Sequence, residues 1–492
     1  MLTSIWLVPA IGALAIGLLP RRASRPLGVL VSAAALVLSG LVAVQFDGGR
    51  HGYQFEEYVP WVGQYGIAYH LGVDGISLWL VVLNALLTLV AILAAGEQMR
   101  RLRSFVTMLL LMEAAMAGVF LAADLLLFYI FWEFQLIPAY FLLWQWGEGP
   151  DTNRAALKFV LYTLVGSLLA LVAVIGEYVY AGGTFDLARL AQHPPAQGIQ
   201  FGLFLLFGLA FAIKVPLFPF HGWLPDAYRA APAPLLVTFA GVMGKTGAYA
   251  MLRILVSLLP HPVLWWDWNG VVPILAVLGI AWGALMALNQ RDMKMLVAYS
   301  SLSHMGFIVL GIFAFNQQGQ QGAVLQMVNH GLIVPALFLL VAWIAGRAGT
   351  RDREALKDLT ARMPVLAGLF LVVTLAALGL PGLNSFVGEF MTLLGAWQLS
   401  PWLAVAGCLG LLLAPIYMLR LFQGAMYASR DEDPWPPGGH GPVATARTDL
   451  ARLEVGILVP LVALMFVLGL YPNLIAQVMP ALAFPISGVP WR

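Results

Sequence analysis

Seven ionisable residues lie inside long apolar stretches of the sequence, where a charge is hard to solvate: Glu113, Glu133, Lys214, Lys245, His304, His330 and Glu389. Glu133 is the only charged residue in the segment FYIFWEFQLIPAYFLL, which runs from Phe128 to Leu143. A charge at the centre of a bilayer costs about 2.5–3.5 kcal/mol, so the five Glu and Lys residues would together cost over about 10 kcal/mol if they faced lipid. We therefore expect these side chains to face one another, or water, inside a helix bundle.

The two cations in this set are both lysines, although the chain uses arginine far more often. Its only lysines are Lys158, Lys214, Lys245, Lys294 and Lys357. A buried lysine can release its proton, whereas a guanidinium group effectively cannot. An ion pair with a purely structural role would be served equally well by arginine. The use of lysine therefore favours proton handling.

The composition identifies the elements that must position these residues as membrane-spanning helices. Of 492 residues, 61% are hydrophobic and 10% are charged, against about 25% charged in an ordinary soluble domain. Cys408 is the only cysteine, which excludes disulfides, thiolate zinc sites and cysteine-ligated iron–sulfur clusters within the chain. No nucleotide-binding glycine motif is present, and the basic residues do not gather into a nucleic-acid patch. The fold class we predict is an all-α integral membrane protein, with its chemistry in the spans.

Apolar windows of about 20 residues predict about fourteen spans. We place them near 2–19, 26–45, 75–95, 105–122, 125–146, 156–180, 200–218, 234–258, 270–289, 297–316, 322–346, 363–381 with 384–398, 402–426 and 454–478. The polar stretches near 46–74, 183–199 and 427–453 are too short for a core of their own and are expected to be connections. Basic residues recur in alternate loops, which predicts that these loops are cytoplasmic and that both termini lie on the periplasmic side. We expect the first span to be retained, because its arginines follow it.

Two of the charged residues lie beside interruptions in their helices. Lys214 stands in FAIKVPLFPFHGWLPDA, which Pro216 and Pro219 break, and Glu389 follows Pro381 and Gly382 in LPGLNSFVGEF. These breaks predict two five-helix repeats, 105–258 and an inverted 270–426, after N-terminal helices in 1–104 and before a cytoplasmic loop and a last span in 427–492. Broken helices at matching places in inverted repeats indicate a transport path near the membrane midplane.

Several motifs carry a resemblance that covers nearly the whole chain. They are DLLLFYIFWEFQLIPAYFLLWQWG, FAIKVPLFPFHGWLPDAYRAAPAP, GVMGKTGAYAMLR, RDMKMLVAYSSLSHMGFIVLG and LPGLNSFVGEF. The chain resembles the antiporter-like subunits of respiratory complex I, the proton-pumping NADH-quinone oxidoreductase, and most closely those of the M type. Glutamate at position 389, where sister subunits commonly carry lysine, and the short C-terminal end distinguish this type.

The resemblance implies a role for each matched residue. Glu133 is the acidic partner of Lys214, and Lys245 is the central lysine. His304 and His330 are bridging groups, and Glu389 is the ionisable residue of the second broken helix. Protons are then expected to pass from Lys245 through the histidines and water to Glu389, with Glu113 a weaker candidate.

The resemblance also implies how this chain shares its work with others. It holds no cofactor or metal of its own, while NADH, FMN, iron–sulfur clusters and quinone belong to partner subunits. Its partners are the other membrane-arm subunits, including sister antiporter-like subunits, and membrane lipid. A bacterial inner membrane is the expected location.

Each site residue also has a structural interpretation. Glu133 and Lys214 could form a fixed ion pair, Lys245 could bond a backbone carbonyl, the histidines could be hydrogen-bonded and neutral, and Glu389 could cap a helix break. Asp124 is expected to be an N-cap, and His221 and Asp226 either line an entry route or fix a loop.

Rival functions are a subunit of a related sodium/proton antiporter or membrane-bound hydrogenase, a stand-alone solute carrier, and a membrane scaffold. A solute carrier predicts a pocket with side chains matched to the solute. A scaffold gives no reason for two buried lysines.

Overall fold

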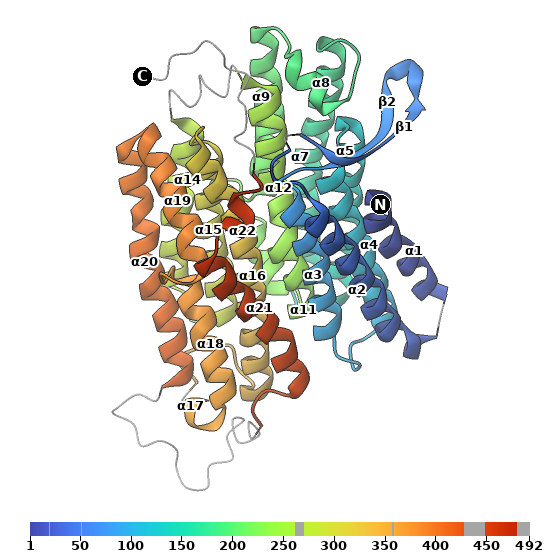
Figure 1. Cartoon of the computed structure of the whole chain (residues 1–492). Coiled ribbons are helices and arrows are strands. Elements are labelled where there is room, and N and C mark those ends of the chain that lie inside the picture. The colour runs from blue at the N-terminus through green and yellow to red at the C-terminus, as the bar shows by residue number, and fades with distance from the viewer. Residues whose placement is uncertain (19, 51, 261–269, 357–358, 428–447, 480–492) are drawn as a thin grey trace, which may run out of the picture.

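The computed structural model describes residues 1–492 except 19, 51, 261–269, 357–358, 428–447 and 480–492. Four helices begin the fold: α1 (Leu2–Leu18), α2 (Arg21–Gln45), α3 (Leu78–Ala94) and α4 (Leu102–Leu121). They form one side of the bundle in Figure 1, where α1 and α2 pack against α4 and α3. The Ser32 hydroxyl of α2 donates to the Ala85 carbonyl of α3, which satisfies a polar group inside this apolar layer.

A β-hairpin occupies part of the stretch predicted to be a simple connection. Strands β1 (Gln54–Val62) and β2 (Ile67–Val73) pair antiparallel around the short 3-10 turn η1 (Gly63–Tyr65). The hairpin projects beside α4 and α5 in Figure 1. The backbone carbonyl of His70 accepts a hydrogen bond from Ala123, so the hairpin is joined to the start of the next span. The purely helical expectation is therefore incomplete at this one place.

The middle of the chain contains the first broken helix. Its elements are α5 (Leu125–Phe134), α6 (Leu136–Trp146), α7 (Thr152–Tyr180), α8 (Leu187–Gln192), α9 (Gln197–Lys214), α10 (Leu224–Ala230) and α11 (Ala233–Thr238). The span that begins with α11 continues through η2 (Phe239–Met243), α12 (Gly244–Ala250) and η3 (Met251–Val256), of which η2 and η3 are π-helical. Single π-turns inside α-helices are frequent at functional sites, and here they flank Lys245.

The second half of the bundle surrounds the long helix α16. Its elements are α14 (Val271–Leu288), α15 (Met293–Ile312), α16 (Gln317–Ala348), α17 (Leu359–Arg362), α18 (Pro364–Ala377), α19 (Asn384–Leu399) and α20 (Pro401–Met426). Helices α21 (Arg452–Leu470) and α22 (Asn473–Ala476) follow. Helix α16 packs against α15 and α19, and also against η2 of the first half. It therefore joins the two halves (Figure 1).

The helix lengths and surfaces are those of a membrane protein. Within the described residues, eleven helices are long and apolar enough to cross a bilayer, and three shorter apolar ones accompany them. Large apolar side chains are exposed along α7 and α20, whereas every residue of α15 except Tyr299 is buried. The predicted spans and the observed helices agree to within a few residues for most of the chain, although the last span ends at Leu470. The count of fourteen and the inverted repeats stay predictions, and most of the predicted 427–453 loop lies outside the described residues.

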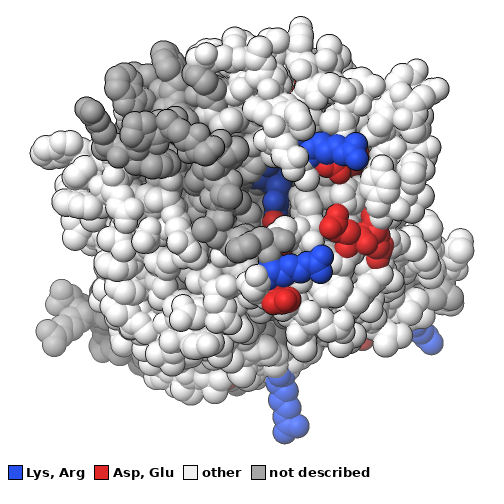
Figure 2. All heavy atoms as spheres, turned by 45° about the horizontal axis from the view of Figure 1, so that its top comes forward, with Lys and Arg blue, Asp and Glu red and all other residues white. Residues whose placement is uncertain are grey.

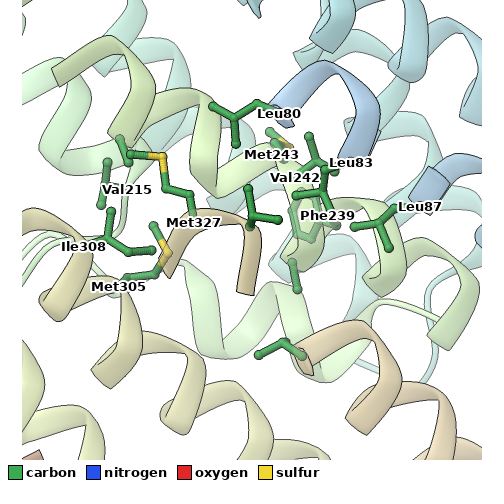
Figure 3. Close-up of a cluster of buried hydrophobic side chains, with 14 of the residues drawn as sticks. Leu80, Leu83, Leu87, Val215, Phe239, Val242, Met243, Met305, Ile308 and Met327 are labelled. Atoms are coloured by element: carbon green, nitrogen blue, oxygen red, sulfur yellow. The ribbon is translucent and has the colours of Figure 1, made fainter. Parts of the chain in front are cut away.

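A cluster of apolar side chains fills the space where the halves meet (Figure 3). Leu80, Leu83 and Leu87 of α3 face Phe239, Val242 and Met243, while Met305, Ile308 and Met327 come from α15 and α16. Val215, directly after the end of α9, belongs to the same cluster. These residues exclude bulk water from the neighbourhood of Lys214 and Lys245, so polar groups there must be satisfied by one another.

Candidate functional site

The first broken helix leaves a lysine at its end, inside the protein. Helix α9 ends at Lys214, whose exposed fraction is only 3%. The Trp223 indole donates to the Ile213 carbonyl at 2.9 Å and so satisfies part of the interrupted backbone. The Lys214 ammonium lies 5.3 Å from the centre of the Trp132 ring, a cation–π distance. Among the described residues it has no hydrogen-bond partner.

Lys245 lies close to this end because a glycine lets two helices approach. A Cβ atom on Gly247 would come within 2.8 Å of the Val215 side chain and 3.2 Å of the Lys214 Cβ. Lys245 itself is fully buried, and its ammonium donates to the Ala240 carbonyl in the π-helical segment at 2.5 Å. The predicted bond to a backbone carbonyl is therefore present, but it is not the only one that Lys245 makes.

A histidine of the second half completes the surroundings of Lys245. The distance from Lys245 Nζ to His330 Nδ1 is 2.7 Å, and His330 Nε2 lies 3.0 Å from the Ser301 hydroxyl. Lys245 comes from α12, His330 from α16 and Ser301 from α15. Three helices from both halves thus meet in one hydrogen-bonded chain, with all three residues at most 2% exposed.

A second buried cluster surrounds Glu389 next to the other broken helix. Its Oε1 atom is 2.7 Å from His304 Nδ1, 2.9 Å from Gln326 Nε2 and 3.0 Å from the Ser385 hydroxyl. The connection from α18 to α19 passes close by, since a Cβ atom on Gly379 would lie 3.3 Å from Glu389 Oε2. Glu389 does not itself cap the break, because its carboxylate binds side chains of α15, α16 and α19.

The two clusters are adjacent. The rings of His304 and His330 have centroids 5.9 Å apart, in an edge-to-face arrangement. The order Lys245, His330, His304, Glu389 therefore runs through consecutive close neighbours from the first half of the bundle into the second. Each member can accept and release a proton, which makes the series able to carry protons stepwise.

Glu133 is placed differently from the sequence-based expectation. It is half-buried rather than fully buried, and it lines an apolar groove of about 540 Å³ between α5, α6 and α7 with Tyr129, Tyr140 and Phe141. Its carboxylate interacts electrostatically with Lys214 and lies near the Ser167 hydroxyl. In the part of the chain that the structure describes, Lys214 Nζ and Glu133 Oε1 have no hydrogen-bond partner, and the two side chains form no ion pair. A fixed ion pair is therefore not what this conformation contains.

The other candidate residues lie outside the buried series. Glu113 points inward with 1% exposure near Ser32, and neither of its carboxylate oxygens has a hydrogen-bond partner among the described residues. Asp124 is the N-cap of α5, as predicted, and accepts from the Leu126 and Leu127 amides. Asp226 pairs with Lys158 at 2.7 Å, which is consistent with fixing a loop.

The uncharged and outlying members of the site were not predicted from the sequence. Ser301, Gln326 and Ser385 complete the two clusters, and Glu177 of α7 is buried without a hydrogen-bond partner among the described residues. One signal was available, because Ser301 precedes His304 by three residues and Gln326 precedes His330 by four. Such spacings place side chains on one helix face.

Comparison with known proteins shows the family of the chain. A family model described as "NADH:quinone oxidoreductase/Mrp antiporter, TM" matches residues 122–413, more than half of the chain. The chain belongs to this family. Among similar curated proteins, NADH-quinone oxidoreductase subunit M of Mycobacterium tuberculosis is 38% identical over 519 residues, covering 96% of this chain and 91% of that protein. Subunit M of Rhodobacter capsulatus is 39% identical, with coverage of 93% and 89%. The family resemblance inferred from the motifs is confirmed.

Solved structures agree with this family assignment. A chain of "Respiratory complex I from Thermus thermophilus with bound NADH" superimposes with a TM-score of 0.86 at 34% identity, covering 97% of this chain and 98% of that one. A chain of the Mrp complex from Dietzia sp. DQ12-45-1b matches with a TM-score of 0.83 at 21% identity, a likeness of fold alone. The predicted membrane fold of the antiporter-like type is confirmed.

Proposed function

We propose that this chain is a membrane-arm proton-translocating subunit of an NADH-quinone oxidoreductase. The observation that carries the proposal is the buried series Lys245, His330, His304 and Glu389, in which hydrogen bonds and one ring contact join the two halves of the bundle. The relatives named subunit M, and the complex I chain with the same fold, supply the class of parent complex. Other membrane-arm subunits, including sister antiporter-like subunits, are the expected partners.

The proposed division of chemistry between subunits follows from the resemblance to complex I. Electron transfer from NADH to quinone, with FMN and iron–sulfur clusters, is assigned to partner subunits, and no redox site to this chain. The energy reaches this subunit as a change in local electrostatics. A proton moved against 100 mV costs about 2.3 kcal/mol, which corresponds to a pKa change of one to two units. Burial and neighbouring charges readily supply that much.

In the proposed transfer, each step moves one proton between neighbouring atoms. The Lys245 ammonium gives a proton to His330 Nδ1, and the His330 ring releases one from Nε2 toward Ser301 and the His304 ring. The proton then passes from His304 Nδ1 to the Glu389 carboxylate. Glu133 and Lys214 act on this series through their charges, since moving them together or apart alters the field at Lys245.

The proposed orientation puts the basic loops in the cytoplasm and both termini on the periplasmic side of a bacterial inner membrane. The alternation of basic loops supports it. Figure 2 turns the opposite end of the bundle toward the viewer, and outside the grey residues it shows few charged groups, most of them basic and acidic side by side, in a largely uncharged surface. Such a face is typical of the translocated side.

The proposal is tested with Lys214→Ala and Glu133→Ala in membranes that hold the whole complex, with assembly checked in parallel. Proton pumping and NADH-quinone electron transfer are measured side by side. If the complex assembles and both rates fall together, the two residues belong to the transfer machinery. If an assembled complex pumps at the parent rate, these residues are structural.

A subunit of a sodium/proton antiporter complex is the second candidate, because the same family model and the Mrp fold cover both. Ion replacement separates the two. Pumping that persists without sodium supports the proton-translocating function, whereas a strict requirement for sodium favours the antiporter.

A further inference from the structure

A cavity of about 370 Å³ opens between the two halves of the bundle at the end that carries the basic loops. Leu236 of α11 and Phe338 of α16 form its apolar walls, and Lys294, Glu148 and Arg351 line its mouth. The side chains of Glu148 and Arg351 are 51% and 38% exposed, so the cavity reaches solvent. The series from Lys245 to Glu389 contains none of these residues.

The cavity is built around one buried lysine. Lys294 is 7% exposed, and its ammonium bonds Glu148 Oε2 at 3.2 Å and the carbonyls of Arg229 and Ala231 at 2.9 and 2.6 Å. Those carbonyls lie at the end of α10. Lys294 therefore holds in place the short helix that carries Tyr228.

Tyr228 stands between the cavity and the buried lysines. Its ring packs edge-on against Phe338, with centroids 5.7 Å apart, and Phe338 lines the cavity. On its other side Tyr228 lies near Ser301. Tyr228, Ser301 and Lys214 together line a second gap of about 10 Å³, which is about the size needed for one water molecule. Ser301 in turn lies 3.0 Å from His330.

We propose that the 370 Å³ cavity is the entrance for protons from the cytoplasm and that the Tyr228 hydroxyl passes them to the buried series. The phenol accepts a proton from cavity water and releases its own into the 10 Å³ gap, so it is neutral before and after one net transfer. Ala240 also lines this gap, and its carbonyl binds the Lys245 ammonium, so the proton enters the series at Lys245. The apolar ring of Phe338 prevents bulk water in the cavity from reaching His330 directly. This inference rests on the proposed function and adds the entry route to it.

The test compares Tyr228→Phe with Tyr249→Phe in the assembled complex. Tyr249 is also fully buried, but its hydroxyl donates to the Phe120 carbonyl, away from the cavity. We expect Tyr228→Phe to slow coupled turnover about fivefold, as for loss of one productive hydrogen bond, and to raise the solvent deuterium isotope effect. Tyr249→Phe should do neither. A merely structural role for Tyr228 would leave the isotope effect unchanged.

Lys245→Ala is measured in the same assay, so that failure of the entry route can be distinguished from failure of the proposed proton-translocating function. If Lys245→Ala is slow while Tyr228→Phe turns over at the parent rate, the entry route is wrong and the proposed function stands. If Lys245→Ala pumps at the parent rate, the proposed function fails and this inference with it.

A second variant covers the case in which Tyr228→Phe does not assemble. Ala342 lines the cavity, so Ala342→Cys in a Cys408→Ser chain offers a thiol to a charged methanethiosulfonate reagent added on the cytoplasmic side. Labelling is expected to inhibit coupled turnover. Complete labelling without inhibition would overturn the entry route.

Discussion

The carboxylate of Glu389 is held by several hydrogen bonds inside the protein. One carboxylate oxygen receives three hydrogen bonds, from His304, Gln326 and Ser385. Three donors stabilise a negative charge that would otherwise be costly so far from water. The same bonds keep the carboxylate aimed at His304, so the residue is both anchored and within reach of a proton.

Replacing Glu389 by glutamine tests its ionisation separately from its shape. Glu389→Gln keeps an oxygen that can accept bonds from the same neighbours, but the amide cannot take up a proton. We expect an assembled complex whose coupled turnover is at least about tenfold slower, in line with losing a positioned acid–base group. The control is Glu354→Gln, a half-exposed carboxylate paired with Arg291, which should behave as the parent.

Residue types alone predicted the ionisable members of the site, because a buried charge inside an apolar run is rare and needs a reason. For Ser301 and Gln326 they offered only the helical spacing from the histidines, because uncharged polar residues inside spans are common and the packing of α15 and α16 decides their partners. They also overstated the burial of Glu133. Hydropathy gives depth along a span, whereas the face that Glu133 presents depends on how α5, α6 and α7 pack.

At the scale of elements, the broken end of α9 must approach α12 closely to bring Lys214 near Lys245. Gly247→Ala would place a methyl group 2.8 Å from Val215, and overpacking of this kind costs about 1–3 kcal/mol. Gly202→Ala on α9, where nothing lies within 4 Å, is the matched control. We expect the thermal unfolding midpoint and coupled turnover to fall only for Gly247→Ala. Equal behaviour of the two variants would contradict the close approach.

The β-hairpin is anchored by a pH-dependent contact outside the spans. His70 lies 3.0 Å from Asp186 through Nδ1 and 3.0 Å from Glu56 through Nε2. The hydrogen bond with Asp186, helped by that with Glu56, raises the pKa of His70 despite its burial. Burial alone would raise the pKa of Asp186, but the hydrogen bond with His70 outweighs it and lowers this pKa.

The signs of these shifts define a pH window. Because the pKa of His70 is raised, its protonated ring stabilises the hairpin anchor fully below about pH 6.5. This stability is lost as the pH rises through the raised pKa of His70. Because the pKa of Asp186 is lowered, its ionised carboxylate stabilises the anchor fully above about pH 4. This contribution is lost as the pH falls through the lowered pKa of Asp186. The hairpin amides should therefore be best protected from hydrogen exchange between about pH 4 and 6.5, relative to His70→Gln at each pH. The same dependence in the variant would rule out His70 as its source, and His193→Gln is the control.

At the level of the whole molecule, the proposed proton route requires both halves of the bundle. The buried series begins on α12 and ends on α19, and α16 packs against both halves. The approximate positions of most spans, and the breaks at Lys214 and before Glu389, were foreseeable from hydropathy and proline positions. The hairpin was not, because its strands lie in a stretch without a strong apolar pattern.

If protons pass through Lys245, replacing it by arginine in the whole complex should stop them. Arginine keeps the positive charge but effectively cannot release its proton. Lys158→Arg changes a half-exposed lysine in the same way and is the control. We predict that the Lys245→Arg complex assembles and that pumping and coupled electron transfer fall together by at least about tenfold, while Lys158→Arg matches the parent. An assembled Lys245→Arg complex that pumps at the parent rate would contradict the account.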